Sequence, residues 1–395
     1  MTKKSDAPAI RFKGFSDAWE QRKLGELVDR VVRKNINNES TLPLTISAQY
    51  GLVDQITYFN NRVASRDVSN YYLVLNGEFA YNKSTSDGYP FGAVKRLDLY
   101  EKGVLSTLYI VFAPKKEQQI DSDYLTVFFD TDRWHKGVAE RAAEGARNHG
   151  LLNISAEDFF DIDLSVPKDI VEQKQIGAFI RQLDHLITLH QRKFEKLTNV
   201  KKSMLEKMFP QNGSSYPEIR FKGFTDPWEQ RKLGDIASDI VAGGDIDKDL
   251  ILAEGQYPVI ANALTGDGIV GYYDKEYRVN APAVTVTGRG DVGHAKTRLV
   301  NFTPVVRLLS VKSEHDVFFL ENAINTLKIV IESTGVPQLT VPQLAKYEVA
   351  FPRQLDEEKH IGAFFKQLDH LITLHQRELE KLQNIKKSML EKMFV

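Results

Sequence analysis

The sequence contains no cysteine among its 395 residues. This absence excludes disulfide bonds, thiolate metal sites and a cysteine nucleophile, and it is typical of a reducing compartment. No segment approaches the ~18 consecutive apolar residues of a membrane-spanning helix, and the N-terminal residues MTKKSDAPA lack the apolar core of a signal peptide. The net charge of −1 gives no overall excess of basic residues, so any attraction to nucleic acid must be local. We therefore expect a cytoplasmic protein that does not associate with membranes.

Motifs for the common catalytic chemistries are missing as well. The chain has no Walker A loop for ATP-driven translocation, and no Asn-Pro-Pro-Tyr or Asp-Pro-Pro-Tyr element for adenine methylation. Its nine histidines show no metal-ligand spacing along the sequence. We expect a chain that is not an enzyme on its own, with no catalytic residues, no metal site and no tightly bound cofactor.

Two short motifs that resemble functional elements have simpler explanations. The segment GRGDVG at Gly288–Gly293 fits a dinucleotide-binding fingerprint, but the HAKTRLVNFTP that follows is charged and strand-like rather than helical. A tight turn is the expected structure. The segments EQK at 172–174 and EEK at 357–359 each fit half of a nuclease metal site. Both fall in the first turn of an expected helix, where acidic residues interact favourably with the helix dipole, so a structural role is expected.

What the sequence does contain is a repeat. Residues 176–209 return as residues 361–394 with 28 of 34 positions identical, and a shorter segment at 10–27 returns at 219–236. The stretches between these segments, 28–170 and 237–354, look almost unrelated. We call 10–27 and 219–236 the short repeats, and 28–170 and 237–354 the first and second inserts. A duplicated framework with different inserts suggests two different recognition modules held by one symmetric scaffold.

The longer repeat predicts a long amphipathic helix in each half. Apolar residues recur at spacings of three and four, a pattern that requires a partner helix to cover it. Each helix would be ~50 Å long at a rise of ~1.5 Å per residue. The expected seam consists of Ile176, Ile180, Leu183, Ile187, His190, Phe194, Leu197, Lys201, Met204 and Met208, together with Ile361, Phe365, Leu368, Ile372, His375, Leu379, Leu382, Lys386, Met389 and Met393.

The inserts predict α+β domains. Strand-like runs such as YYLVL (71–75) and AVTVT (283–287) are bounded by Gly, Asn, Pro and Asp, and short helical patterns follow near 122–145 and 316–333. The expected segments are a first conserved segment (1–27), a first insert domain (28–170), a first long helix (171–209), a linker with the second conserved segment (210–236), a second insert domain (237–354) and a second long helix (355–395).

Chain order predicts how the halves connect. Phe209 ends the first long helix only ten residues before Ile219 opens the second short repeat, so by symmetry Ile10 should begin near Phe394. The halves would then form a closed pseudo-twofold ring with antiparallel helices, in which His190 and His375 approach each other as a polar layer that fixes the register. Two tandem units on a string are the alternative, but each would leave an apolar stripe exposed. A proton switch is a second interpretation of the histidines.

The chain resembles the specificity subunits of type I restriction–modification enzymes. The resemblance rests on the W-E-x-x-x-L-G segments at Trp19–Leu27 and Trp228–Ile236, the EQKQIGAF and EEKHIGAF helix starts, and the QLDHLITLHQR cores. It implies an α+β fold in which two α/β target recognition domains are separated by two long antiparallel coiled-coil helices in a pseudo-twofold cyclic arrangement. The two inserts differ in length, which departs slightly from a strict repeat.

The resemblance also implies a function. Each insert would read one half of an asymmetric, bipartite double-stranded DNA site, and the helices would set the spacing and dock two methyltransferase subunits. Restriction subunits would join the full complex. S-adenosylmethionine, ATP and Mg²⁺ would be bound by those partner subunits. A coiled-coil interaction scaffold with no DNA role, or a solitary sequence-specific DNA-binding protein, are the alternatives.

Candidate DNA-contacting residues come from polar, glycine-flanked loops after strand-like runs, because base edges are read by Arg, Lys, Asn, Gln, Ser and Thr. The candidates in the first insert are Ser47, Gln49, Tyr50, Asn82, Lys83, Ser84, Thr85, Arg141, Arg147 and His149. Those in the second insert are Asn262, Thr265, Thr287, Arg289, His294 and Lys296. Leucines on the outer face of the helices are the candidates for contact with protein partners: Leu189, Leu205, Leu374 and Leu390.

Overall fold

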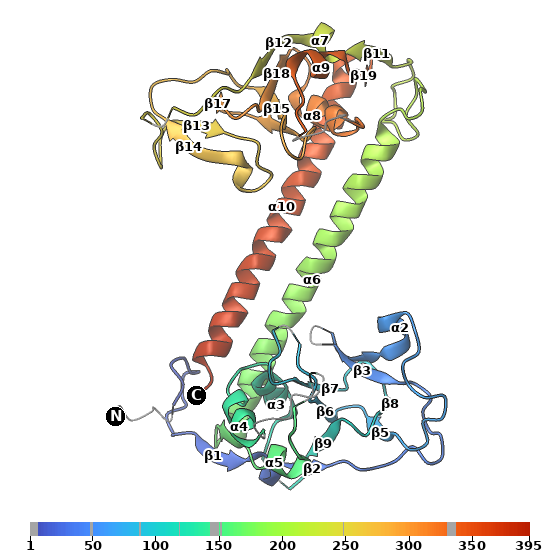
Figure 1. Ribbon diagram of the computed structural model, residues 1–395, viewed down its shortest axis with the longest axis vertical. Helices are drawn as coiled ribbons and strands as arrows, with labels where there is room; N and C mark the ends of the chain where they lie inside the picture. The colour runs from blue at the N-terminus through green and yellow to red at the C-terminus, as the bar shows by residue number, and fades with distance from the viewer. Residues whose placement is uncertain are drawn as a thin grey trace. The chain divides into compact units, whose positions relative to one another are not determined.

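The computed structural model describes residues 7–47, 50–86, 88–117, 119–142, 150, 152–247, 249–329 and 337–395. The chain divides into two units (Figure 1): unit 1 contains Met1–Leu189 with Leu379–Val395, and unit 2 contains His190–Glu378. The two long helices predicted from the repeat are confirmed as α6 (Ile170–Met208) and α10 (Leu355–Lys392). Each unit therefore contains one part of each helix.

Unit 1 is an α+β domain attached to the start of α6. In chain order its elements are β1 (Glu20–Lys23), α1 (Leu24–Leu27), β2 (Val28–Arg30), β3 (Leu44–Ser47), β4 (Gly51–Asp54), α2 (Gln55–Phe59), β5 (Tyr72–Leu75), β6 (Phe79–Asn82), β7 (Ala93–Arg96), β8 (Lys102–Leu105), β9 (Ile110–Pro114), α3 (Ser122–Phe129), α4 (His135–Arg141), α5 (Ala156–Phe160) and β10 (Asp163–Val166). The largest sheet has the strand order β2-β9-β6-β7, and the pairs β1-β10, β3-β4 and β5-β8 complete the unit.

Unit 2 is built on the same plan. Its elements are β11 (Glu229–Lys232), α7 (Leu233–Ile236), β12 (Ala237–Ala242), β13 (Tyr257–Ile260), the 3₁₀ turn η1 (Gly266–Gly268), β14 (Ile269–Tyr273), β15 (Ala283–Val286), β16 (Ala295–Arg298), β17 (Thr303–Pro304), β18 (Leu309–Ser313), α8 (Val317–Asn325), α9 (Val341–Lys346) and β19 (Glu348–Phe351). Its sheets have the orders β12-β18-β15-β16, β14-β13-β17 and β11-β19.

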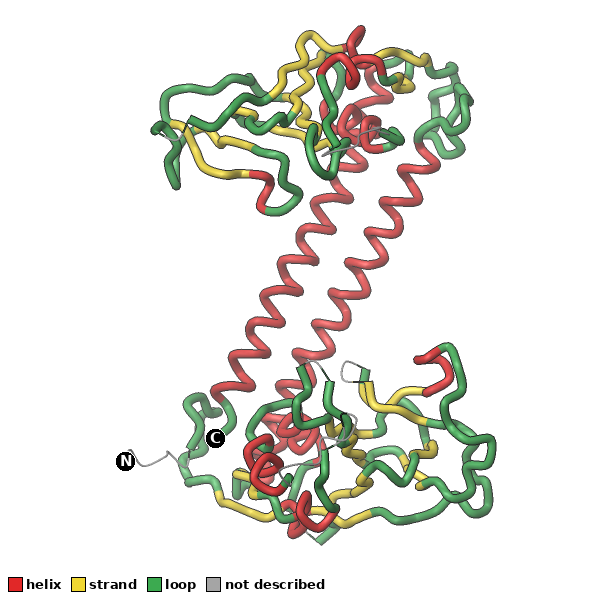
Figure 2. Tube along the Cα trace, viewed as in Figure 1, coloured by secondary structure: helices red, strands yellow, loops and turns green. Residues whose placement is uncertain are grey.

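The two inserts share a topology that their sequences conceal. In each, the strand after the short repeat (β2 or β12) pairs with the last strand of the main sheet (β9 or β18). That strand pairs with β6 or β15, which pairs in turn with the edge strand β7 or β16, and all these pairings are antiparallel. A helix then packs on the edge strand: α3 contacts β7 in unit 1, and α8 contacts β16 in unit 2. Figure 2 shows the strands confined to the inserts and the segments that flank them, and the long repeats as continuous helices. The helices predicted near 122–145 and 316–333 are confirmed as α3 with α4, and as α8.

Each short repeat fastens its insert to the helices. Its EQRK strand pairs antiparallel with the strand that precedes the long helix, as β1 with β10 and β11 with β19. The tryptophan before that strand lies in the core against the end of a long helix. Trp19 contacts Phe394 with ring centroids 6.2 Å apart, and Trp228 contacts Phe209 at 6.0 Å. The last turn of α10 therefore completes the core of unit 1, and the last turn of α6 completes that of unit 2.

The predicted connection of the halves is confirmed within each unit. The backbone N–H of Ile10 donates to the carbonyl of Lys392 at 3.0 Å, and that of Ile219 donates to the carbonyl of Lys207 at 2.9 Å. Equivalent residues of the two short repeats thus make the same hydrogen bond to equivalent residues of the long helices. The first short repeat begins where α10 ends, although these segments lie at opposite ends of the sequence.

The seam of the helices differs from the expectation in its central part. Ile176, Ile180 and Leu183 are buried near the start of α6, but Ile187 and Phe194 are only half-buried. The same change occurs along α10. The physical reason is coverage: near the insert domains the helices pack against a protein core, whereas in the central part each helix has one neighbouring helix to cover its apolar stripe.

Candidate nucleic-acid interface and helix faces

An arginine of each short repeat binds the first turn of a long helix. Arg11 donates two hydrogen bonds to Glu172, at 2.6 and 2.8 Å, and Arg220 donates two to Glu357, at 2.7 and 2.8 Å. Both carboxylates are only 1% exposed. The hydrogen bond to glutamate raises the pKa of each arginine above its already high value. These glutamates therefore fasten the short repeats to the helices, which confirms the structural role expected for the EQK and EEK segments.

The next residue of each helix binds the insert domain. The side chain of Gln173 accepts a hydrogen bond from the backbone N–H of Asp121, at 2.9 Å, just before α3. Its counterpart Glu358 accepts from the backbone N–H of Asp316 at 3.3 Å and contacts the ring of His315 at 2.8 Å. The helix starts therefore position the insert domains as well as the short repeats.

A glycine one turn further along each helix permits close approach. A Cβ at Gly177 would lie 2.8 Å from the backbone nitrogen of Tyr124, and a Cβ at Gly362 would overlap Asp316. Real Cβ atoms do not come as close to backbone atoms as a Cβ at Gly177 would, so this position needs glycine. At Gly362 a Cβ would displace the carboxylate of Asp316, which accepts hydrogen bonds from the backbone N–H groups of Phe318 and Phe319. The glycines let α3 and α8 lie directly against the long helices.

Polar pairs connect α6 and α10 at three places. Lys386 forms an ion pair with Asp184 at 2.6 Å in unit 1, and Lys201 forms one with Asp369 at 2.6 Å in unit 2. Between them in sequence, the Nδ1 atoms of His190 and His375 lie 3.1 Å apart, which confirms the predicted approach of the two histidines. The residue numbers of the partners on α10 fall from 386 to 369 as those on α6 rise from 184 to 201, so the helices are antiparallel.

Each unit contains a cleft between its insert domain and the helices. The cleft in unit 1 has a volume of about 670 Å³ and that in unit 2 about 620 Å³. The helical walls are equivalent in the two repeats: Asp184, Thr188, Lys386 and Leu390 line the first, and Lys201, Leu205, Asp369 and Thr373 line the second. The insert walls differ. In each unit, therefore, a helical wall that is the same in both repeats faces an insert wall that is specific to that unit.

In both clefts, an acidic residue of the insert domain lies near the lysine that forms the ion pair between α6 and α10. In unit 1 the carboxylate of Asp130 lies 3.6 Å from Lys386 and 2.7 Å from Lys95. In unit 2 burial raises the pKa of Glu321, and the charge of Lys201 opposes that rise. The electrostatic arrangement of the clefts is therefore similar even though their insert residues differ.

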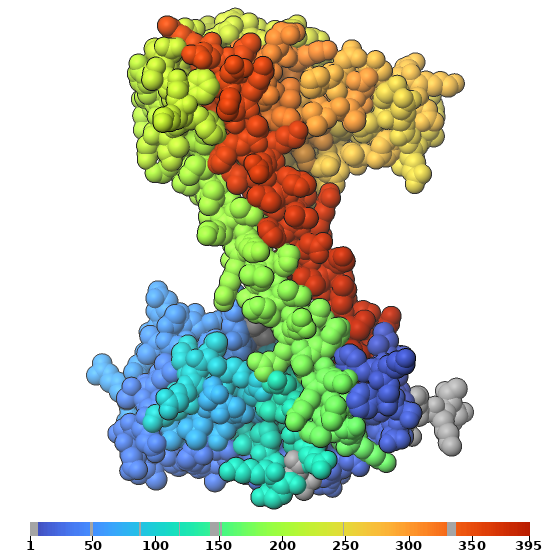
Figure 3. Space-filling view, turned by 180° about the vertical axis from the view of Figure 1, so that it is seen from behind, coloured from blue at the N-terminus to red at the C-terminus, as the bar shows by residue number. Residues whose placement is uncertain are grey.

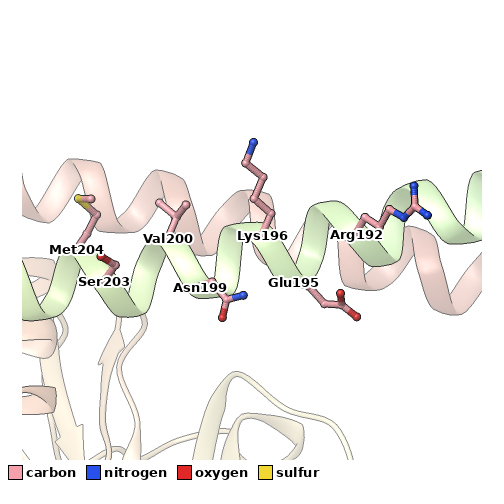
Figure 4. A pocket seen from close by; sticks show the side chains of 7 residues that line it. All are labelled: Arg192, Glu195, Lys196, Asn199, Val200, Ser203 and Met204. Atoms are coloured by element: carbon pink, nitrogen blue, oxygen red, sulfur yellow. The ribbon is translucent and has the colours of Figure 1, made fainter. Parts of the chain in front are cut away.

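The outer faces of the helices repeat as well. A shallow hollow of about 530 Å³ on α6 is lined by residues that all come from that helix (Figure 4): Arg192, Glu195, Lys196, Asn199, Val200, Ser203 and Met204. The residues at the equivalent positions of α10 are Arg377, Glu380, Lys381, Asn384, Ile385, Ser388 and Met389. Only valine to isoleucine differs between the two sets. On the face drawn in Figure 3, parts of both long helices lie at the surface.

The four leucines predicted to contact partners fall into two classes. Leu189 and Leu374 are exposed, with 38% and 43% of their surface accessible. Leu205 and Leu390 are half-buried against the cores and line the two clefts. The members of each class are equivalent residues of the two repeats.

In unit 2, the candidate DNA-contacting loops are tied together by Asn262. Its side chain accepts a hydrogen bond from the backbone N–H of Gly288 at 2.7 Å and donates one to the carbonyl of Val306. This asparagine therefore holds the GRGDVG loop beside the turn at 306–307. Arg289 is exposed at the tip of the first loop, and Arg307, which the sequence analysis did not select, is exposed in the second with a φ of +66°.

The remaining candidates of unit 2 differ in accessibility. The hydroxyl of Thr287 is engaged with the carbonyl of Asp291 at 2.6 Å, and its side chain is buried, so it shapes the loop. Thr265, His294 and Lys296 are exposed. The ring of His294 contacts the carboxylate of Asp291 at 3.1 Å, and Lys296 forms an ion pair with Asp267. The turn expected at GRGDVG is confirmed, since strand β16 and no helix follows it.

The candidates of unit 1 also have mixed surroundings. Ser47 is buried and its hydroxyl accepts a hydrogen bond from the N–H of Tyr50, whose own ring is 63% exposed. Arg141 pairs with Asp161 at 2.8 Å. In the loop after β6, the side chain of Asn82 accepts a hydrogen bond from the backbone N–H of Ser84, and Lys83 and Thr85 donate to the carbonyls of Ile154 and Gly150. Ser84 is exposed within this loop. Gln49, Arg147 and His149 lie outside the described residues.

Comparison with known proteins agrees with this architecture. The profile of the family described as "Type I restriction modification DNA specificity domain" matches residues 17–199 and 225–384, which is most of the chain. The chain belongs to this family. The two matched segments each contain one insert, the strand pair that flanks it and part of the long helix that follows, so each half of the chain is one specificity domain.

Individual relatives carry the same family name. A protein of Mycoplasma pneumoniae named as a type I specificity subunit is 32% identical over 137 residues, which cover 33% of this chain and 37% of that protein. The specificity subunit of the Methanocaldococcus jannaschii type I restriction enzyme MjaVIII is 22% identical over 369 residues, covering 84% of this chain and 82% of that protein. The fold is similar to the crystal structure of a type I restriction–modification S subunit from M. genitalium, with a TM-score of 0.67, 13% identity and coverage of 98% and 99%.

The described residues contain neither a membrane-spanning helix nor a cluster of three or more metal-ligating side chains. None of the described helices is long and apolar enough to cross a membrane. Within the same residues, no group of three or more His, Asp or Glu side chains lies in an arrangement that could hold a metal ion.

Proposed function

We propose that this chain reads an asymmetric, bipartite site on double-stranded DNA, with one half-site recognised by each insert domain. The supporting observation is the contrast within the repeat: the two inserts share a topology and an attachment to the helices, but their sequences differ. Identical inserts would read identical half-sites, whereas different loops on the same fold read different bases. The family to which the chain belongs is described as a DNA specificity domain, which agrees with a role in DNA recognition.

The loops that carry exposed polar side chains are the proposed reading surfaces. In unit 2 these are the loop with Arg289 and the turn with Arg307, which Asn262 connects. Arginine is suited to this role because its guanidinium donates two hydrogen bonds to the major-groove edge of guanine. In unit 1 the exposed Tyr50 and Ser84 are the corresponding candidates. The buried Ser47 and Thr287 are proposed to support these loops rather than to touch DNA.

We also propose that the helices dock two methyltransferase subunits and set the spacing of the half-sites. Two copies of one partner need two copies of one surface. The exposed residues Arg192, Glu195, Lys196 and Asn199 of α6 and their equivalents on α10 provide them. The exposed pair Leu189 and Leu374 supplies an apolar contact in each copy. A helix of 39 residues is ~58 Å long and compares with ~34 Å for one turn of DNA, so half-sites about one turn apart are expected.

The chemistry is assigned to partner subunits in this proposal. The methyltransferase subunits would bind S-adenosylmethionine, and restriction subunits would bring ATP and Mg²⁺. This chain would be a non-catalytic, cytoplasmic component that binds none of the three tightly. The sequence supports this division because it has no Walker A loop and no motif for adenine methylation.

Exchange of the first insert tests the proposal. Residues 28–170 would be replaced by an insert from another member of the family, and methylated adenines would be mapped in cells that contain the partner subunits. The expected result is a new sequence in one half of the methylated site and an unchanged other half. Methylation that is independent of this chain would refute the proposal and favour a coiled-coil scaffold with no DNA role. DNA binding without any partner subunit would favour a solitary DNA-binding protein.

A further inference from the structure

We infer that His190 and His375 form a binding site for a transition-metal ion between α6 and α10. The Nδ1 atoms of the two rings face each other at 3.1 Å. With a metal–nitrogen bond of ~2.05 Å, nitrogens at this separation subtend an angle of about 98° at the metal, between the octahedral and tetrahedral values. The two nitrogens share a hydrogen bond, so binding of a metal requires its proton to move to the Nε2 atom of the same ring and the rings to rotate until both lone pairs point at the ion.

The geometry is matched by the chemistry of the two side chains. Imidazole nitrogen is a good ligand for Zn²⁺, Ni²⁺ and Cu²⁺ when the ring is neutral. Burial, and then the neighbouring His190 and Lys193, lower the pKa of His375, which favours the neutral ring. Both rings are half-buried, so water can reach the site and fill the remaining coordination positions. Such a site is exchangeable rather than structural, because the protein supplies two ligands only.

The pair was not visible as a metal motif in the sequence because its members belong to different helices. His190 and His375 are equivalent residues of the repeat, so the site requires both copies of the helix. The two rings hydrogen-bond to each other through their Nδ1 atoms. A metal ion at this position would join α6 to α10 and would stabilise the native pair of helices, since it binds the folded state alone.

Titration of the full chain with NiCl₂ tests the inference. Isothermal titration calorimetry should show one site per chain, and the variants His190→Gln and His375→Gln should each weaken binding at least ~10-fold, because loss of a ligand should cost no less than loss of an outer-shell partner. His185→Gln and His370→Gln are the matched controls, since both histidines are exposed on the same helices. Circular dichroism of each variant should show that the helices remain intact.

A second measurement identifies the ligands directly. The electron paramagnetic resonance spectrum of the chain with one equivalent of Cu²⁺ should show coupling to two imidazole nitrogens, and this coupling should be lost in His375→Gln but retained in His370→Gln. Binding that is equal in the wild type and in a His190→Gln/His375→Gln double variant would overturn the inference. So would binding that depends on His185 or His370. None of these readouts involves DNA or methylation, so they are independent of the proposed function.

Discussion

Loss of the Glu172 charge should release the first short repeat from the long helix. In Glu172→Gln the guanidinium of Arg11 loses the carboxylate that it contacts at 2.6 and 2.8 Å. Removing one partner of a fully buried ion pair costs about 3–5 kcal/mol. Because the Arg11 side chain is 13% exposed and can regain some hydration, we expect a smaller loss of about 2–4 kcal/mol. This loss is local, because Arg11 belongs to the first short repeat and not to the insert.

The measurement is hydrogen exchange of the backbone amides in residues 10–27. Global unfolding is not a suitable readout, because a chain of two units does not unfold in one step. A loss of 2–4 kcal/mol corresponds to a fall in protection of roughly 30- to 1,000-fold, at about 1.4 kcal/mol per factor of ten. Amides of the second short repeat at 219–236 should be unaffected, because Arg220 keeps its own partner Glu357.

The chain offers a matched control and an internal replicate. Glu26 pairs with Arg22 at 2.7 Å, but its side chain is 52% exposed, so Glu26→Gln should change protection by less than about 1 kcal/mol. Glu357→Gln should reproduce the effect at 219–236 and leave 10–27 unchanged. Equal effects of Glu172→Gln and Glu26→Gln would refute the reasoning, because the buried pair would then contribute no more than an exposed one.

Further predictions concern the cores, the helix glycines, acidity and specificity. Phe394→Ala should destabilise unit 1 by about 3–5 kcal/mol, measured as earlier protease cleavage of residues 7–189, and cleavage confined to 190–378 would contradict it. Gly177→Ala should lower the hydrogen-exchange protection of α3 even though alanine gains about 1 kcal/mol of helix propensity, because its Cβ would collide with the backbone of α3; higher protection would show that the contact relaxes freely. Burial lowers the pKa of His375 below 6.5, so the unfolded chain binds the proton first and stability falls as the pH drops below that value. His375→Gln should remove this part of the pH dependence of hydrogen-exchange protection in α10, and an unchanged pH dependence would contradict it. Arg289→Ala should relax one base position by about 1–3 kcal/mol in methylation-site mapping, while unchanged specificity would assign base reading to other loops.

The scaffold could be predicted from the sequence because its signals are strong and repeated. Long apolar periodicity defines a helix reliably, and a repeat of that helix defines its partner. The approach of His190 to His375 and the position of Ile10 near the end of α10 followed from symmetry alone. The burial of the central seam was overestimated, because periodicity indicates which face turns inward but not what covers it.

The inserts could not be predicted to the same depth. Their strands are mostly four residues long, and the pairing of β2 with β9 or β12 with β18 joins segments far apart in sequence. Such pairings depend on tertiary packing that a single sequence does not reveal. The Arg11–Glu172 pair was missed for the same reason, because 161 residues separate its members. A usable signal did exist, since both residues recur in the second half as Arg220 and Glu357.

The candidate interface was predicted at the level of loops but not of side chains. The sequence selected the segments around Asn262 and Arg289, which the structure joins through a hydrogen bond to Gly288. It also selected Thr287, whose hydroxyl is turned into the loop, and it did not select Arg307. Polarity and glycine content locate a loop, whereas the direction of a side chain depends on backbone contacts that form only in the fold.

The use of Phe394 to complete the first core sets the order in which the protein can be finished during synthesis. Unit 2 consists of His190–Glu378 and is complete in sequence before the last residues of the chain are made. Unit 1 must wait for Met393 and Phe394, although almost all its residues are made first. At about 5–20 residues per second, the interval between Phe209 and Phe394 lasts roughly 10–40 s. During this time the surface around Trp19 and Tyr124 has no helix end to cover it, so the oldest part of the nascent chain is the last to reach its native state.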